Sequence, residues 1–311
     1  MLLVKNDSQI IIKHKKISKA IFRENMTGWL FLSFNLIGYI IFKLVPIIFS
    51  LYLSFCNWNM VSGLKGIKFA GLKNYIDLLT DNTFIKSLEN TIIFALVSVP
   101  TSIFLALILA VIINDKIFGK NLVRLSFYIP NIVSMAAISI VWAVLYMPTF
   151  GPINTLLRSI GLTHPPAWLS STKWALPSII IMSIWQSVGY NAIILLAGLQ
   201  GVPQTLYESA DIDGANGFTK FFKVTLPMIS PTMFFVLVIS IMSSFQVFTP
   251  VNIMTQGGPG TSTTVLVYYI YKTAFTYSKI GYANAIGWIL FLLVFGFTLL
   301  QWKFSNKESL Y

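Results

Sequence analysis

The sequence predicts an all-α integral membrane protein with six transmembrane helices, and its composition, apolar runs and basic residues all support this fold class. Of the 311 residues, 56% are hydrophobic and only 10% are charged, and the mean hydropathy is +0.75. This composition excludes an ordinary soluble domain. A helix needs roughly 20 apolar residues to cross a bilayer. Six such runs occur, at about residues 28–55, 90–113, 125–147, 174–199, 228–249 and 281–302.

The basic residues predict how these helices are oriented. Residues 1–24 hold six Lys or Arg, and the apolar run that follows is too long for a cleaved secretory signal peptide. With this segment in the cytoplasm, 13 of the 22 basic residues fall in cytoplasmic segments and 8 in external ones, as the positive-inside bias requires. The predicted parts are a basic cytoplasmic N-terminus at 1–24, a first transmembrane helix at 25–56, an external segment at 57–88, a five-helix core at 89–302 and a cytoplasmic tail at 303–311.

The net charge of +12 could indicate a nucleic-acid-binding protein, but the basic residues follow the predicted membrane topology. We therefore expect a lipid bilayer and no nucleic acid as a partner. Cys56 is the single cysteine, which excludes an intramolecular disulfide framework and a cysteine-rich metal site. No metal ligand or catalytic residue is expected, because His14 and His164 both lie outside the apolar runs. A membrane-embedded enzyme is accordingly disfavoured.

The longest polar interruption in the second half of the chain predicts two short helices joined by a glycine corner. Pro203 suits the first turn of a helix, and Gly214 suits the stop after it. Gly217 permits a second turn, after which aromatic residues recur at helical spacing until Leu226-Pro227 ends the run. The first helix is acidic, whereas the second presents an aromatic face.

The spacing in this interruption resembles a known motif. The motif consists of Glu208-Ser209-Ala210, three residues, Gly214, nine residues and then Val224-x-Leu226-Pro227. It is similar to the cytoplasmic signature loop of ABC importer permeases. In this chain Ser209 stands in place of the commoner Ala, and Val224 in place of Ile. In that family the loop is the coupling helix, which sits in a groove of the ATP-binding subunit. The residues to which the resemblance and the helix pattern assign ATPase coupling are Glu208, Ser209, Ala210, Asp213, Gly214, Gly217, Leu226 and Pro227. We refer to residues 200–226 as the coupling loop. The alternative is an ordinary solvated loop between two spans.

The resemblance covers nearly the whole chain. Segments that carry it include 69–75 (FAGLKNY), 183–190 (SIWQSVGY), 254–260 (MTQGGPG) and 281–283 (GYA). They are similar to the first of two permease subunits in bacterial binding-protein-dependent importers of oligosaccharides or glycerol 3-phosphate. The resemblance implies a type I ABC importer permease fold, a second homologous permease, two cytosolic ABC ATPases and an extracytoplasmic solute-binding protein. The motif G-x-x-x-x-G-K-[ST] does not occur, so ATP and Mg are expected on the ATPase subunits and no cofactor on this chain.

Polar side chains near the middle of two spans predict the solute pathway, because polar groups in a bilayer are costly unless they face a cavity or one another. Neutral hydroxyls and amides beside aromatic rings suit a sugar, and the absence of charge favours a neutral carbohydrate over glycerol 3-phosphate. The predicted residues are Trp185, Gln186, Ser187, Tyr190, Asn191, Ser240, Ser244 and Gln246. The alternative is that they glue helices together. The related maltose permease holds its sugar on the same two spans, but it has amides where this chain has Ser244 and Val247, so the partner permease is the other candidate holder of the solute.

Lys43 lies within the first predicted span, where a bare ammonium costs about 3 kcal/mol or more. Snorkelling to the membrane surface is one interpretation, and contact with the partner permease is the other. A rival to the importer hypothesis is a secondary carrier driven by an ion gradient. Such a carrier is expected to have inverted repeats, broken helices and intramembrane acids, and the predicted spans contain no Asp or Glu.

Overall fold

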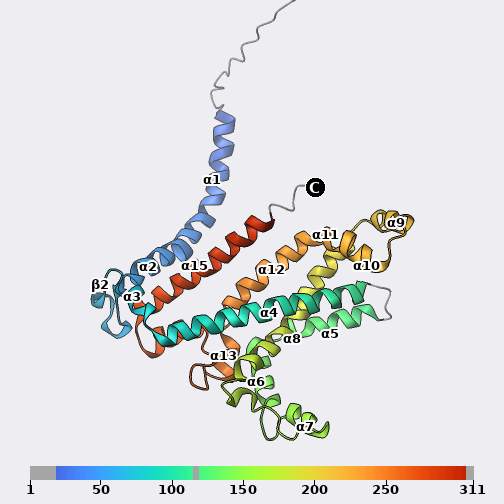
Figure 1. Ribbon diagram of the computed structural model, residues 1–311. Coiled ribbons are helices and arrows are strands. Elements are labelled where there is room, and N and C mark those ends of the chain that lie inside the picture. The colour runs from blue at the N-terminus through green and yellow to red at the C-terminus, as the bar shows by residue number, and fades with distance from the viewer. Residues whose placement is uncertain (1–18, 115–118, 306–311) are drawn as a thin grey trace, which may run out of the picture. The chain divides into compact units, whose positions relative to one another are not determined.

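The computed structural model describes residues 19–114 and 119–305, and nearly all of its regular structure is helical (Figure 1). The chain divides into two compact units, residues 1–52 and residues 53–311. In chain order the α-helices from the second unit onward are α3 (Lys73–Leu79), α4 (Asn82–Asn114), α5 (Lys120–Ile132), α6 (Met135–Leu145), α7 (Pro152–Ser159), α8 (Ala175–Gln200), α9 (Gln204–Ile212), α10 (Gly217–Lys220), α11 (Leu226–Met228), α12 (Ser230–Phe245), α13 (Thr249–Met254), α14 (Leu266–Tyr271) and α15 (Ile280–Ser305).

The first unit contains the first predicted span. α1 (Lys19–Tyr39) continues through a π-helix at Ile40–Leu44 into α2 (Val45–Ser54), which crosses the boundary between the units. From Met26 to Ser54 this helix is long and apolar enough to cross a membrane. Lys43 lies in the π-helix with an exposed side chain. The predicted basic N-terminus falls mostly at residues 1–18, and most of the predicted tail at residues 306–311, both of which lie outside the described residues.

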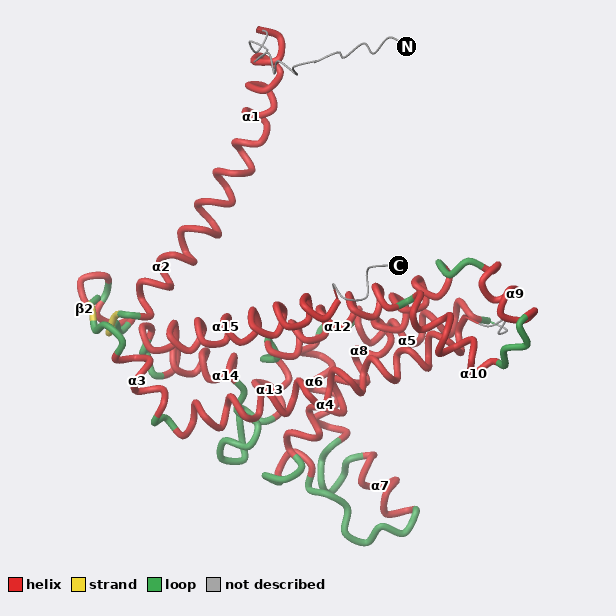
Figure 2. Tube along the Cα trace, turned by 45° about the horizontal axis from the view of Figure 1, so that its top comes forward, coloured by secondary structure: helices red, strands yellow, loops and turns green. Residues whose placement is uncertain are grey.

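The core of the second unit forms where α4 packs against α8 and α12. Val99, Ile103 and Ala106 of α4 share a buried cluster with Leu195 of α8 and Val236 of α12. Figure 2 shows α4, α5 and α8 side by side along much of their length. Small residues at such contacts let helix backbones approach closely in a membrane protein.

Gly189 of α8 lies against the backbone of α5. A Cβ atom at this position would lie 1.7 Å from the carbonyl oxygen of Phe127, so only glycine permits the contact. The packing of these two helices therefore depends on a missing side chain.

The prediction that the third span is a single helix is wrong. The run at residues 125–147 forms α5 and α6, which meet at an angle of 96°. Val133 and Ser134 both adopt extended backbone there, and Pro130 has already removed one backbone hydrogen bond near the end of α5. Within the described residues, five helices are long and apolar enough to span a membrane, and the bent pair makes a sixth when it counts as one span. The six-span fold class is thus confirmed, with one span broken.

Two other spans differ in detail from the prediction. α4 begins at Asn82, eight residues before the expected start, and so includes Lys86 and Glu89, which form an ion pair with 2.9 Å between Nζ and Oε2. The fifth span is interrupted between α12 and α13 at Gln246 to Phe248. Residues beside both interruptions, among them Asn131 and Gln246, line one cavity.

The segment between the first two spans is folded. Strands β1 (Cys56–Asn57) and β2 (Lys68–Phe69) pair antiparallel, with Cys56 opposite Phe69, and 3₁₀-helices occupy Met60–Ser62 and Leu64–Gly66 between them. A short helix, α3, follows β2. Its buried Asn74 donates hydrogen bonds from Nδ2 to the carbonyl oxygens of Ser54 (2.8 Å) and Cys56 (2.9 Å), which fixes α3 against the start of this segment.

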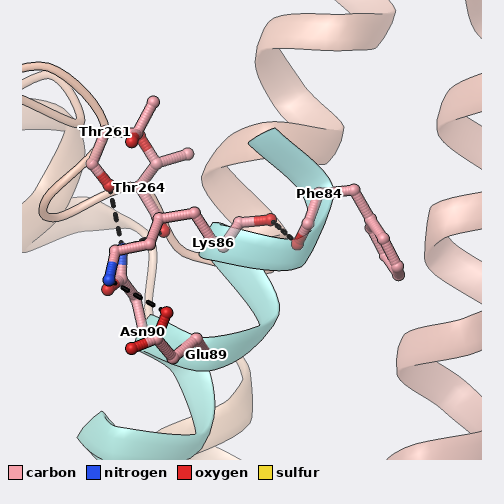
Figure 3. Close-up of polar contacts among 7 residues, drawn as sticks. Phe84, Lys86, Glu89, Asn90, Thr261 and Thr264 are labelled. Carbon is pink, nitrogen blue, oxygen red and sulfur yellow. Dashed lines mark hydrogen bonds and ion pairs between the residues drawn. The ribbon is translucent and has the colours of Figure 1, made fainter. Parts of the chain in front are cut away.

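The glycine-rich loop at residues 255–264 leads into a short helix, α14. Asn90 of α4 holds the loop: its Nδ2 donates to the carbonyl oxygens of Thr261 and Thr264, each at 2.9 Å (Figure 3). Thr264 in turn donates from Oγ1 to the carbonyl oxygen of Gly257 at 3.0 Å. A π-helix at Lys272–Thr276 follows α14 and precedes α15.

Candidate functional site

The coupling loop contains the predicted two helices and the predicted corner. α9 ends at Ile212, and Gly214 then adopts a φ of +73°, a left-handed conformation that glycine allows without strain. Asn216 caps α10, because its Oδ1 accepts a hydrogen bond from the N–H of Thr219 at 2.8 Å. Gly217 is therefore the first residue of α10, and the prediction that it makes a turn is wrong. Pro203 precedes α9 in extended backbone, one residue before the expected first turn.

The prediction that Leu226-Pro227 ends the second helix is also wrong. α10 continues through a π-helix at Phe221–Thr225 into α11, which contains Pro227. The N–H of Leu226 donates to the carbonyl oxygen of Phe221, five residues earlier, which is the wider spacing of a π-helix. Because proline has no N–H and crowds the carbonyl four residues before it, a widened turn at this place lets the chain stay helical. The helical run thus passes Pro227 and ends at Met228, and a one-residue turn at Ile229 separates it from α12.

Two side-chain contacts hold the short helices together. Lys220 of α10 forms an ion pair with Asp211 of α9. The hydroxyl of Tyr207 lies 3.0 Å from Oγ1 of Thr225, within hydrogen-bond distance. These contacts link α9 to both α10 and the π-helix, so the loop is one compact body.

The outer surface of the coupling loop carries the predicted polar residues and two apolar residues that the sequence reasoning did not assign. Glu208, Ser209 and Asp213 are exposed. Ile212 and Phe218 are 88% and 75% exposed, respectively, which is unusual for large apolar side chains that flank a corner. An acidic patch with exposed apolar side chains is typical of a surface that contacts another protein.

A central cavity of about 330 Å³ lies where α4, α8 and α12 meet the breaks in the third and fifth spans. Seven of the eight predicted solute-pathway residues line it: Gln186, Ser187, Tyr190, Asn191, Ser240, Ser244 and Gln246. Asn191 and Ser240 approach each other across the cavity wall, with 3.4 Å between Nδ2 and Oγ. The structure therefore assembles residues from two spans around one space.

Trp185 is the predicted residue that the structure leaves out of this cavity. Its side chain is 47% exposed, and its ring packs on Trp142 of α6 with the ring centroids 5.4 Å apart. A step of one residue along a helix turns the side chain by about 100°, so Trp185 and Gln186 face different surroundings.

The central cavity also has polar lining residues that the sequence reasoning missed. Ser98 and Ser102 come from α4, Asn131 from the end of α5, Ser183 from α8 and Thr249 from α13. Oγ of Ser183 is buried and has no hydrogen-bond partner among the described residues. Its position three residues before Gln186 and four before Ser187 was the signal that could have identified it.

No charged side chain lines the central cavity, all of whose lining residues lie in the described part of the chain. The polar groups are hydroxyls and amides, and Tyr190 and Phe248 supply aromatic rings. This arrangement can exchange hydrogen bonds with neutral hydroxyl groups and contact the apolar faces of a ring.

Residues 81–306 match the sequence profile of the binding-protein-dependent transport system inner membrane component family. The chain belongs to this family. Its members are transport permeases rather than enzymes, and membership makes this chain a multi-pass protein of the inner membrane. The family match begins at Asp81, immediately before α4, and includes both the central cavity and the coupling loop.

Related proteins support the same assignment. The chain is 37% identical over 276 residues to the probable ABC transporter permease protein YurN of Bacillus subtilis, which covers 87% of this chain and 94% of YurN. It is 34% identical over 290 residues to the lactose transport system permease protein LacF of Rhizobium radiobacter, covering 92% of this chain and 96% of LacF. In fold it is similar to a chain of a bacterial alginate ABC transporter, with a TM-score of 0.81, 23% identity and coverage of 95% of this chain and 99% of that one.

Proposed function

We propose that this chain is one permease subunit of an ATP-driven importer and forms half of the translocation pathway for a neutral carbohydrate. The observation that carries the proposal is the central cavity, which combines seven predicted polar residues without any charged side chain. Buried hydroxyls and amides with free hydrogen-bonding capacity favour a ligand that is itself rich in hydroxyls. The lactose permease LacF is a relative whose named solute fits this chemistry.

The absence of charge in the cavity separates this proposal from a phosphate-bearing solute. A phosphate group favours Arg or Lys side chains or a helix N-terminus. The described residues that line the cavity provide neither an Arg nor a Lys. Glycerol 3-phosphate, the other solute class that the sequence resemblance includes, is therefore the less suitable ligand.

The partners in this proposal are a second homologous permease, two cytosolic ATPases and an extracytoplasmic solute-binding protein. ATP and Mg bind to the ATPases, and the coupling loop and both chain termini lie in the cytoplasm. The exposed acids at Glu208 and Asp213 together with Ile212 and Phe218 support contact with a protein groove at this loop. The basic residues of the sequence support the same orientation.

The mechanism that follows is alternating access. ATP-driven closure of the ATPases moves the coupling loop as one body, because the Asp211–Lys220 and Tyr207–Thr225 contacts join its helices. The loop is joined through α11 and a one-residue turn at Ile229 to α12, which carries Ser240 and Ser244 of the cavity. Motion of the loop can thus reach the solute site through this short connection.

The proposal is tested by identifying the solute and then transporting it. Thermal-shift screening of the cognate solute-binding protein against neutral oligosaccharides, acidic oligosaccharides and glycerol 3-phosphate should give stabilisation by a neutral sugar. The complete transporter, reconstituted in proteoliposomes, should then transport that sugar when ATP is supplied on the side of the membrane that carries the ATPases. Stabilisation of the binding protein by phosphorylated or acidic compounds alone would contradict the proposed solute class.

Uptake driven by an ion gradient without ATPase subunits would contradict the importer assignment itself. The two outcomes would overturn different parts of the proposal. The first overturns the solute class and leaves the ATP-driven importer, whereas the second favours the secondary carrier.

A further inference from the structure

The short helix α3 has an exposed face of unusual composition. α3 lies at the end of the second unit away from α9 and α10 (Figures 1 and 2). It packs against α15, and Thr80 and Asp81 connect it to α4. The helix is therefore placed beside two of the membrane-spanning helices, and its own faces can be compared with theirs.

One face of α3 is buried and fixes the orientation of the helix. Asn74 is 7% exposed and Leu78 is 0% exposed. Nδ2 of Asn74 donates to the carbonyl oxygens of Ser54 and Cys56, and the hydroxyl of Tyr75 donates to Oγ of Ser54 at 2.7 Å. These bonds tie α3 to the end of the first predicted span, so its rotation about its own axis is set.

The opposite face of α3 is apolar and exposed. Ile76 is two residues from both Asn74 and Leu78, and two steps of about 100° turn its side chain away from the buried face. Leu72, just before α3, and Leu79, in its last turn, are four and three residues from Ile76 and share its face. Leu72 and Ile76 are each 61% exposed, and Leu79 is 74% exposed. We call these three side chains the α3 apolar face.

The charged residues of α3 lie to one side of this face. Lys73 and Asp77 are exposed and four residues apart, so they share a face between the buried and the apolar ones. Both line a cavity that Asp81 and Lys279 also line. A helix on the surface of a soluble protein places polar residues opposite its buried face. α3 places three apolar side chains there instead, which is the pattern of a helix that lies in a membrane interface.

The level of α3 along α15 agrees with this pattern. α15 carries no charged residue before Lys303, and roughly 20 residues of helix cross the hydrocarbon core of a bilayer. Counted back from Lys303, such a stretch ends near Ala283. Leu78 of α3 belongs to the same buried cluster as Ala285 and Ile286 of α15. α3 therefore lies at the depth where the hydrocarbon core ends.

Exposed apolar side chains also flank the α3 apolar face along the chain. Phe69 of β2, three residues before Leu72, is 71% exposed. In α4, Ile85 of the first turns is 47% exposed and Leu96 is 64% exposed. α4 is long and apolar enough to span the membrane, so its exposed apolar residues face lipid. At the edge of the hydrocarbon core, the bilayer itself covers such side chains.

We propose that the α3 apolar face inserts into the bilayer, at the boundary between headgroups and acyl chains of the leaflet on the side away from the coupling loop. Leu72, Ile76 and Leu79 contact acyl chains, while Lys73 and Asp77 stay in the water of the headgroup region. In the orientation of the proposed function this is the outer leaflet. The contact depends on the membrane location of the chain and on the packing of α3, and it is independent of which solute is carried.

Spin-label electron paramagnetic resonance on the complete transporter in lipid nanodiscs tests this contact. A nitroxide is attached at Ile76→Cys, and its collisions with oxygen, which partitions into lipid, are compared with its collisions with a water-soluble nickel chelate. The oxygen-to-nickel collision ratio should be about threefold or more higher at Ile76→Cys than at Asp77→Cys, because the two adjacent side chains point into lipid and into water. Leu79→Cys should give the same result as Ile76→Cys, and it serves as the test if Ile76→Cys does not assemble.

Two controls make the labels specific. Cys56, the single cysteine of the chain, is 0% exposed, so the unsubstituted chain should take up no label when the partner subunits lack reactive cysteines. Lys73→Cys, on the charged side of α3, should give the same collision ratio as Asp77→Cys.

Three outcomes would overturn the proposal. Equal ratios at Ile76→Cys and Asp77→Cys would mean that the α3 apolar face lies in water. A label at Ile76→Cys that collides with neither reagent would mean that protein covers the face, from the first helix or the partner permease. Loss of the oxygen collisions on addition of the solute-binding protein would assign the face to that protein. Failure of the solute screen, by contrast, would leave the spin-label result intact.

Discussion

The coupling loop and the central cavity differ in how they are built. The loop is continuous in sequence, with α9, its glycine corner and α10 following one another within residues 204–220. The cavity takes its lining from segments near residues 94–102, 131–135, 183–191 and 239–250. The loop is charged and exposed, whereas the cavity is uncharged and lies among several helices. Local spacing can therefore identify the loop, but only the packing of several helices creates the cavity.

The largest expected effect comes from reversing the charge of the coupling loop. Glu208→Lys should abolish ATP-driven uptake, because the exposed carboxylate would be replaced by an ammonium at the surface proposed to contact the ATPase. Uptake into proteoliposomes and ATP hydrolysis stimulated by the solute-loaded binding protein are the measurements. Glu89→Lys, an exposed acid on α4, is the matched control and should retain most of the uptake. Normal coupling in Glu208→Lys would remove the assigned role of the loop.

The packing that creates the cavity should be sensitive to a single methyl group. Gly189→Ala should destabilise the protein by about 1–3 kcal/mol, because the new Cβ would overlap the carbonyl of Phe127 and force α5 and α8 apart. Gly287→Ala is the control, since nothing lies within 4 Å of a Cβ atom there. Thermal unfolding in detergent should separate the two variants. Equal stabilities would show that the α5–α8 contact is not as close as the structure indicates.

Adjacent residues of α8 give a sharper test of the cavity. Gln186→Ala should raise the apparent KM for the solute by about tenfold, because it removes a hydrogen-bonding group from the cavity. Trp185→Phe should stay within about twofold, since its ring packs on Trp142 outside the cavity. ATPase stimulation at saturating solute should be retained in both. A larger effect from Trp185 than from Gln186 would mean that the solute passes on the other face of α8.

The far end of the second unit should respond to acid. Burial raises the pKa of Asp81, but hydrogen bonds from Tyr269, Tyr282, Phe84 and Thr83 offset this and hold the pKa below its usual range. The carboxylate therefore contributes stability above the usual pKa of about 3.9, and this contribution is lost as pH falls through the lowered value. Asp81→Asn should show a smaller fall in unfolding temperature between neutral and acidic pH than the wild type. An equal fall in unfolding temperature for the two proteins would contradict the stabilising role of the Asp81 carboxylate.

The smallest effect is expected in the first span. Lys43→Leu should leave uptake within about twofold, because an exposed lysine can extend its ammonium toward the membrane surface. Co-purification of the partner subunits measures whether the complex still assembles. Loss of transport with intact assembly would favour the contact with the partner permease.

The sequence predicted the features that depend on composition and local spacing. Apolar run length identified the spans, and Gly214 identified the corner of the coupling loop, because each depends on neighbouring residues. The break between α5 and α6 was missed because a continuous apolar run hides where the backbone leaves the helix, although Pro130 and Ser134 lie at that place. An apolar run indicates that a segment lies in lipid, but it does not indicate whether the helix is straight or broken.

The candidate site was predictable only in part, for the same reason. Gln186 and Tyr190 share a helix face, so spacing placed them together, whereas Trp185 was included by proximity in sequence alone. Asn131 and Ser102 reach the cavity from other helices, and no spacing within one helix relates them to Gln186. The contribution of the Gly189 contact is likewise a tertiary effect, since it depends on the carbonyl of Phe127.

The central claim is that the coupling loop contacts an ATPase and moves the helices around the solute cavity. A photo-cross-linking amino acid at Ile212, which is 88% exposed, tests this most directly in the complete transporter in nanodiscs. The account predicts a cross-link to the ATPase subunit whose yield changes when ATP is added. A cross-link to the solute-binding protein, or none to any subunit in the intact assembly, would contradict it.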